Sequence, residues 1–161
     1  MASLLAGCSG RDPDAYPKAL AEDAHVALLG ALKDPASALF QDVAWSTGVD
    51  GPTICGLVNS KNSMGGYTGM QRFVRTFSPD DAAILEQVAK GETSKDLARH
   101  ELKANRLIAE SHNRFPDNGE AIKPTSLLVT EEQVGKSKMD HVWASRCGFP
   151  DPVASPNAFT N

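Results

Sequence analysis

The chain has 161 residues, 41% of them hydrophobic and 22% charged, which is ordinary for a globular protein and suits one domain with a real core. The formal net charge is -4 and the pI is near 5.5. This acidic balance argues against a nucleic-acid partner, because such binding depends on lysine and arginine displacing counterions from phosphate.

The N-terminus resembles the lipobox of a bacterial lipoprotein precursor. Residues 4–8 read LLAGC: a leucine, further small residues, and then Cys8, whose sulfur would be acylated. Only seven residues precede Cys8 and none is basic, so we expect the native start to lie further upstream. The alternative is a chance run of small residues.

If Cys8 is acylated, the protein is a periplasm-facing, membrane-anchored lipoprotein. Ser9 after the cysteine favours the outer over the inner membrane under enteric-type sorting. Residues 1–16 would then be the lipobox and a tether, residues 17–148 one folded domain, and residues 149–161 an irregular tail.

The first half of the domain predicts a helix followed by a strand meander. Apolar residues at helical spacing favour a helix over residues 17–33. Pro35 ends it, and we expect a short helical turn over 36–39. Alternating bulky residues then predict strands at 40–46, 53–59 and 70–77, with both sides of the middle strand partly apolar, as in a central strand.

The glycine-rich stretch between the second and third strands, NSKNSMGGYTGMQRF, invites comparison with phosphate-binding loops. It lacks the GxxxxGK and GxGxxG patterns, and it leads into a strand-like segment, so no helix N-terminus is available for a phosphate. We therefore interpret it as a turn that needs glycine for its backbone angles. Its polar residues form a candidate recognition loop: Asn59, Lys61, Asn62 and Tyr67.

The second half of the chain predicts mainly helices. Ser78-Pro79 is a strong helix start, and that helix should run to Gly91. A second helix, from near Thr93 to about Arg114, is amphipathic and should turn a basic face outward, away from an apolar side. The basic residues are Lys95, Arg99, Lys103 and Arg106, and the apolar ones are Leu97, Ala104, Leu107, Ile108 and Phe115.

The C-terminal part adds a short strand and a last helix. Residues 127–129 favour a fourth strand, and Thr130 with Gln133 has the spacing of a capping box. Met139, Trp143 and Cys147 fall four apart, on one face of this last helix.

Cys55 and Cys147 are the best candidates for a disulfide. Cys55 lies in the middle strand and Cys147 on the same helix face as Trp143, so a helix packed across the sheet could join them. In an oxidising periplasm the bond would contribute roughly 2–4 kcal/mol. The alternative is a pair of buried free thiols.

Patterns typical of metal or catalytic sites do not occur in the sequence. The four histidines are scattered, and neither HExxH, CxxC nor GxSxG is present, so we expect no metal, no cofactor and no assignable catalytic residue. The basic face of the 93–114 helix is interpreted as solvated, with contact to phospholipid headgroups as the lesser alternative.

Three segments together resemble a group of short exported bacterial and phage proteins. They are LKDPASALF at 32–40, CGLVNSKNSMGGYTG at 55–69, and the late Trp143 with Cys147; the group pattern is LKDPxSAxF, CGxVNxKNxxGGYxG and a closing Trp and Cys. The resemblance covers roughly 18–77 and 138–148 and implies a compact α+β domain without implying an activity. The helical stretch 78–126 departs from the group as an insertion.

We therefore predict an α+β fold: a three- to four-stranded antiparallel meander packed by N- and C-terminal helices, with an inserted helical pair. The expected function is non-enzymatic binding at the bacterial cell envelope. The alternative is a structural or accessory component of a phage or envelope assembly, favoured by an apolar patch on residues 82–108. An envelope-directed hydrolase ranks third and would need a polar pocket with converging histidine and carboxylate groups.

Overall fold

The computed structural model describes residues 12–48, 50–114 and 125–148 and has a single antiparallel sheet at its centre. The strands follow one another in space as in the chain: β1 Asp34–Gly48, β2 Gly51–Lys61, β3 Gln71–Thr76 and β4 Leu127–Thr130. This confirms the α+β meander. The predicted lipobox, most of the tether and the predicted tail lie outside the described residues.

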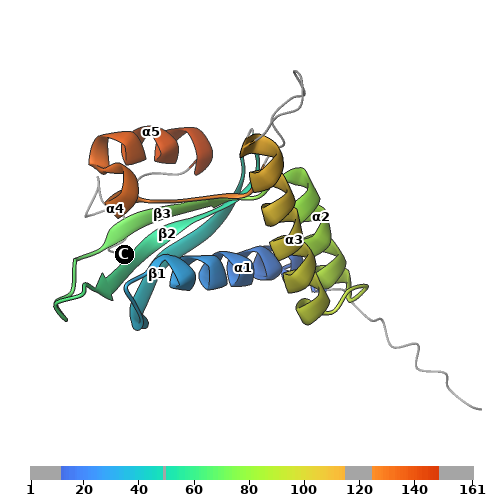
Figure 1. The fold of residues 1–161 in the computed structure, drawn as a ribbon, viewed down its shortest axis with the longest axis horizontal. Coiled ribbons are helices and arrows are strands. Elements are labelled where there is room, and N and C mark those ends of the chain that lie inside the picture. Colours follow the sequence, from blue (N-terminus) through green and yellow to red (C-terminus); the bar gives the residue numbers. More distant parts are fainter. Residues whose placement is uncertain (1–11, 49, 115–124, 149–161) are drawn as a thin grey trace, which may run out of the picture.

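Helices cover both faces of the sheet (Figure 1). One face carries α1 (Ala15–Ala31), and the pair α2 (Pro79–Lys90) and α3 (Lys95–Arg114) stands beside α1 at one end of the sheet. The opposite face carries α4 (Glu131–Val134) and α5 (Lys136–Arg146). The N- and C-terminal helices therefore lie on opposite sides of the sheet, and the inserted pair extends the α1 side.

The two faces of β2 build two separate cores, as its apolar character on both sides predicted. Ile54 and Val58 face α1 and join the larger core, which also contains Phe73 and Phe77. Cys55 faces α5 and joins the smaller core. Successive strand residues point to opposite faces, so a strand buried on both sides must be apolar on both.

The helical turn predicted for residues 36–39 is wrong, because this segment belongs to β1. Asp34 pairs with Lys61 and the next pair is Leu39 with Asn59, so the residues between them bulge from the ladder. The hydroxyl of Ser37 accepts a hydrogen bond from the Lys61 amide (2.8 Å) and donates one to the Asp34 carbonyl (2.9 Å). The partner strand thus overrides the local helix-start signal of Pro35.

The helix boundaries follow the local signals elsewhere. Ser78 caps α2 by accepting a hydrogen bond from the Asp81 amide (3.3 Å), and Gly91 ends it in the left-handed region at φ 74°. The last helix is divided in two, however, because Gly135 adopts φ 81° between α4 and α5. This break redirects the chain so that α5 lies across the sheet.

Candidate functional site

The glycine-rich segment is a turn between β2 and β3, as predicted. The side-chain oxygen of Asn62 accepts hydrogen bonds from the amides of Met64 (3.0 Å) and Gly66 (3.1 Å), and that of Asn59 accepts one from Gly69 (3.1 Å). Gly65 and Gly69 adopt φ 81° and 89°, which side-chain-bearing residues rarely do. The two asparagines therefore hold the turn together and have their carbonyl oxygens engaged within it.

The other two residues of the candidate recognition loop face outward. The Lys61 ammonium lies 5.4 Å from the centre of the Tyr67 ring, and the two residues form an isolated β-bridge. Tyr67 is half exposed and Met64 at the tip is 92% exposed. Lys61 and Tyr67 are thus placed where a partner could reach them.

The predicted disulfide is present. Cys55 on β2 and Cys147 at the end of α5 are bonded, with their Cα atoms 6.0 Å apart and 92 positions apart in the chain. Both cysteines are buried together with Met139 and Trp143, which were predicted to lie on the same helix face as Cys147. The bond fixes the far end of α5 to the centre of the sheet. Cys8 lies outside the described residues.

A buried arginine that the sequence analysis did not single out attaches α4 and α5 to the sheet on the same face as the disulfide. The Arg72 side chain on β3 is 0% exposed; its guanidinium donates to both Glu131 oxygens (3.0 and 3.1 Å) and pairs with Asp140 (2.7 Å). Arg72 beside Glu131 holds the pKa of that carboxyl below its usual value of 4.5, mainly through the side-chain hydrogen bond. This cluster attaches α4 and α5 to the sheet.

A second arginine of β3 points to the other face and lines a groove. Arg75 pairs with Asp23 on α1 (3.0 Å) and lies over the Phe77 ring at 5.1 Å, while its buried Nε has no hydrogen-bond partner among the described residues. The groove comprises two adjoining hollows of about 220 and about 640 Å³ that share Arg75, Arg106, Thr125 and Ser126. We call it the Arg75 groove.

The walls of the Arg75 groove are mixed: apolar side chains alternate with polar ones, which include Asp80, Asp81 and Gln133. Val26, Ala27 and Ala31 of α1 line one side, and Leu102, Ile108 and Ala109 of α3 line the other. Its size is within the range of small-molecule sites. The larger hollow is lined by the guanidinium groups of Arg75 and Arg106 without a carboxylate, which suits an anionic group of a partly apolar ligand.

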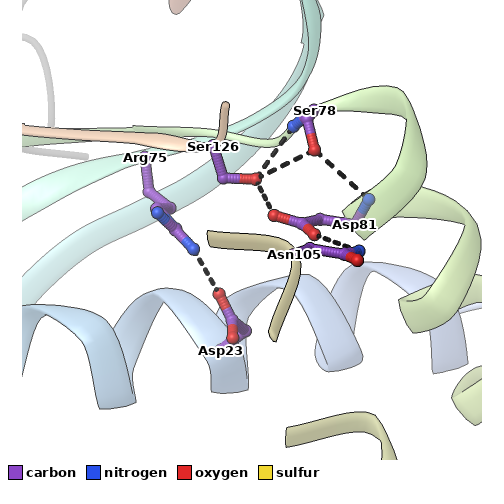
Figure 2. A network of polar contacts seen from close by, with 6 residues as sticks. All are labelled: Asp23, Arg75, Ser78, Asp81, Asn105 and Ser126. Carbon is purple, nitrogen blue, oxygen red and sulfur yellow. Dashed lines mark hydrogen bonds and ion pairs between the residues drawn. The ribbon is translucent and has the colours of Figure 1, made fainter. Parts of the chain in front are cut away.

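A polar network closes one end of this groove (Figure 2). The Ser126 hydroxyl accepts a hydrogen bond from the Ser78 amide (2.9 Å) and donates one to Asp81, whose other oxygen accepts from the Asn105 amide group (3.2 Å). The network joins the start of β4 to the N-terminus of α2 and to α3. Its hydroxyl and carboxylate groups are engaged with one another, which fits a structural joint better than a reactive serine.

The outer surface of α3 differs from the prediction. The helix packs against α2, and Ala98, Leu102 and Ala109 lie on its inward side. Leu97, Leu107 and Ile108 remain 53%, 57% and 56% exposed. The expectation that only the basic side faces outward is therefore wrong. Phe115, counted with this apolar side, lies outside the described residues.

The basic side of α3 is partly engaged with α1. Lys95 and Arg99 reach Glu22, at 2.5 and 3.8 Å. These ion pairs are exposed and lie on the α1 side of the helix. The buried residues Ala98 and Ala109 pack inward instead of the more strongly apolar side, so that side faces solvent, which the helix pattern alone did not predict.

The described part of the chain has neither a metal-binding cluster nor a membrane-spanning helix. It contains no group of three or more His, Cys, Asp or Glu side chains arranged to hold a metal ion. His25 packs edge-on against Phe40, with ring centres 4.7 Å apart, and His100 and His141 are exposed. None of the helices in these residues is both long and apolar enough to cross a bilayer.

Four residues of the candidate site and its supports were not singled out from the sequence: Arg72, Arg75, Asp23 and Ser126. Two arginines inside a strand with apolar neighbours were an available signal, since a charged residue in a central strand needs a buried partner. Comparison with known proteins adds nothing to these assignments: no protein-family model, no curated protein and no solved structure matches the chain.

Proposed function

We propose that the protein is an exported, non-enzymatic binding protein of the bacterial cell envelope, anchored by lipid on Cys8 and facing the periplasm. The observation that carries this proposal is the buried Cys55–Cys147 disulfide, which closes a loop of 92 positions through the smaller core. Disulfides of this kind persist in oxidising compartments and are rare in the reducing cytosol.

The lipobox-like sequence supports the same compartment and gives the third cysteine a separate role. Cys8 is the one cysteine of the chain that does not take part in the disulfide, and it follows the small residues of LLAGC. Acylation would keep the folded domain at a membrane surface without a spanning helix.

The Arg75 groove supports ligand binding. It combines guanidinium groups, hydroxyls and apolar side chains, and its described lining has no histidine to act as a base beside Ser126. We expect its ligand to place a carboxylate or phosphate group in the larger hollow, whose lining does not include the carboxylates of Asp80 and Asp81.

One observation favours the alternative of an assembly component: the exposed apolar residues of α3 lie within the region where a docking patch was expected. In that alternative the helix would meet a neighbouring envelope or phage protein.

Mass analysis of the native protein extracted from membranes tests the proposal. We expect an N-terminal Cys8 carrying a diacylglyceryl group, and no titratable thiol before reduction. A cytosolic protein with three free thiols and no lipid would overturn it. A lipidated protein that co-purifies in fixed stoichiometry with one envelope protein would favour the assembly alternative.

A further inference from the structure

The apolar side of α3 is an unusual surface for this chain. Leu97, Leu107 and Ile108 are each more than half exposed, and Ala104, also exposed, lies between them on the same side of the helix. We call these four residues the α3 stripe. Helices that lie in a membrane interface show this combination of a limited apolar side and an otherwise charged surface.

The charge of α3 is opposite to that of the chain. The helix has five basic residues (Lys95, Arg99, Lys103, Arg106, Arg114) and three acidic ones (Asp96, Glu101, Glu110), whereas the whole chain has a net charge of -4. Lys95 and Arg99 are paired with Glu22, whereas Lys103 is exposed four positions before Leu107, where its ammonium can complement anionic headgroups. The excess of basic residues opposes pairing of α3 with α3 of a second copy, because like charges would be brought together.

The position of α1 brings α3 close to the proposed lipid. Six residues separate Cys8 from Ala15, the first residue of α1, so an extended tether spans at most about 25 Å. Lys95 at the start of α3 contacts Glu22, which lies about 10 Å along α1 from Ala15. Figure 1 shows the start of α1 beside α2 and α3, at the end of the molecule where the chain enters the fold.

We propose that α3 docks on the membrane surface, with the α3 stripe at the boundary between headgroups and acyl chains and Lys103 near lipid phosphates. This inference rests on the lipid anchor of the proposed function for its geometry. Docking would fix the orientation of the domain on the bilayer by a second contact besides the lipid on Cys8.

The test couples Cys8 chemically to a maleimide-bearing lipid in vesicles that contain phosphatidylglycerol, using the full chain. Cys55 and Cys147 are bonded to each other, so Cys8 is the reactive thiol. Because the coupling is chemical, the test does not depend on acylation in the cell. Failure of docking is thereby separated from failure of the anchor, which mass analysis decides.

Two reporter variants compare surfaces of similar exposure: Leu107→Trp on α3, and Leu39→Trp on β1, whose leucine is 51% exposed. With brominated acyl chains in the vesicles, we expect the emission added by Leu107→Trp to fall at least about twofold, since an interfacial side chain reaches the acyl boundary. The emission added by Leu39→Trp should be unchanged. Equal quenching at the two positions would overturn the proposal.

A second measurement removes the apolar contact without a reporter. In the uncoupled Cys8→Ser chain, Leu97→Ser with Ile108→Ser should weaken partition onto the same vesicles about tenfold. The two serines bury less apolar surface in the bilayer than the leucine and isoleucine that they replace. Leu39→Ser with Val43→Ser is the matched control and should leave partition unchanged. A vesicle-independent, concentration-dependent shift of the Leu107→Trp emission would identify a second copy as the occupant and overturn the proposal.

Discussion

The two faces of the sheet surround their β3 arginines differently. Arg72 and Arg75 lie three positions apart on β3, so they point to opposite faces. Arg72 is fully buried and joins two carboxylates of α4 and α5, whereas Arg75 has one carboxylate of α1, a buried Nε without a partner among the described residues, and a groove beside it. The α5 face is thus closed by covalent and ionic bonds, and the α1 face retains space for a ligand.

Removing the disulfide from the α5 face should cause the largest loss of stability. A Cys55→Ala, Cys147→Ala double variant should lose about 4–5 kcal/mol of unfolding free energy, because the bond closes a very long loop in the unfolded chain. Urea unfolding followed by circular dichroism measures it. Cys8→Ser should leave the urea midpoint unchanged, and a comparable loss in that variant would contradict the assignment.

Replacing each arginine by methionine compares the two faces directly. Arg72→Met should cost about 3–4 kcal/mol, because the fully buried guanidinium is the common partner of Glu131, which is largely buried, and of the half-exposed Asp140. Arg75→Met should cost only about 1–2 kcal/mol, since Asp23 loses a single ion pair.

The matched pair is measured by urea unfolding under the same conditions. Equal losses of unfolding free energy would show that the two arginines stabilise the fold equally and would contradict the proposed difference between the two faces. Adding Glu131→Gln and Asp140→Asn to Arg72→Met should recover part of its loss, because the unpaired charges are then removed.

The α5 face should also dominate the response to acid. The pKa of Glu131 is lowered in the folded protein, so its contribution to stability is present above about pH 4.5 and is lost as pH falls toward the lowered folded pKa. Urea midpoints from pH 7 to pH 3 should therefore fall more steeply in the parent than in Arg72→Met. Parallel curves for these two proteins would contradict the cause assigned to the shift, and Arg75→Met should keep the parental slope.

The smallest expected effect concerns the polar network beside the groove. Ser126→Ala should cost about 1 kcal/mol, because the Ser78 amide and one Asp81 oxygen lose their hydrogen-bond partner. Ser145→Ala on α5 is the control, since that hydroxyl is exposed and donates to the Val142 carbonyl of its own helix, so its loss should change little. No difference between the two would mean that Ser126 is dispensable for the structure.

Much of the fold could be predicted from local chemistry. Ser78-Pro79 marks a helix start, the glycines of the β2–β3 turn mark a reversal, and Met139, Trp143 and Cys147 mark a buried helix face. The disulfide followed from the same face, because only one strand cysteine was available to meet it. These features depend on residues close together in the chain or on a single pairing.

The errors arose where a distant partner decides the outcome. Residues 36–39 join β1 because Lys61 pairs with Asp34 and Ser37 satisfies the bulge. The strongly apolar side of α3 faces solvent because the helix packs inward through Ala98 and Ala109 instead. Neither outcome is visible in the local periodicity.

Local residue patterns were enough to specify the element types, the central position of β2 and the two cysteines that bond, because backbone preferences and apolar periodicity act over a few residues. Tertiary packing was needed to establish which carboxylates meet Arg72 and Arg75, where the groove opens and which side of α3 stays exposed. Those outcomes depend on the energies of contacts between segments that lie far apart in the chain and come together only when the sheet and its helices pack.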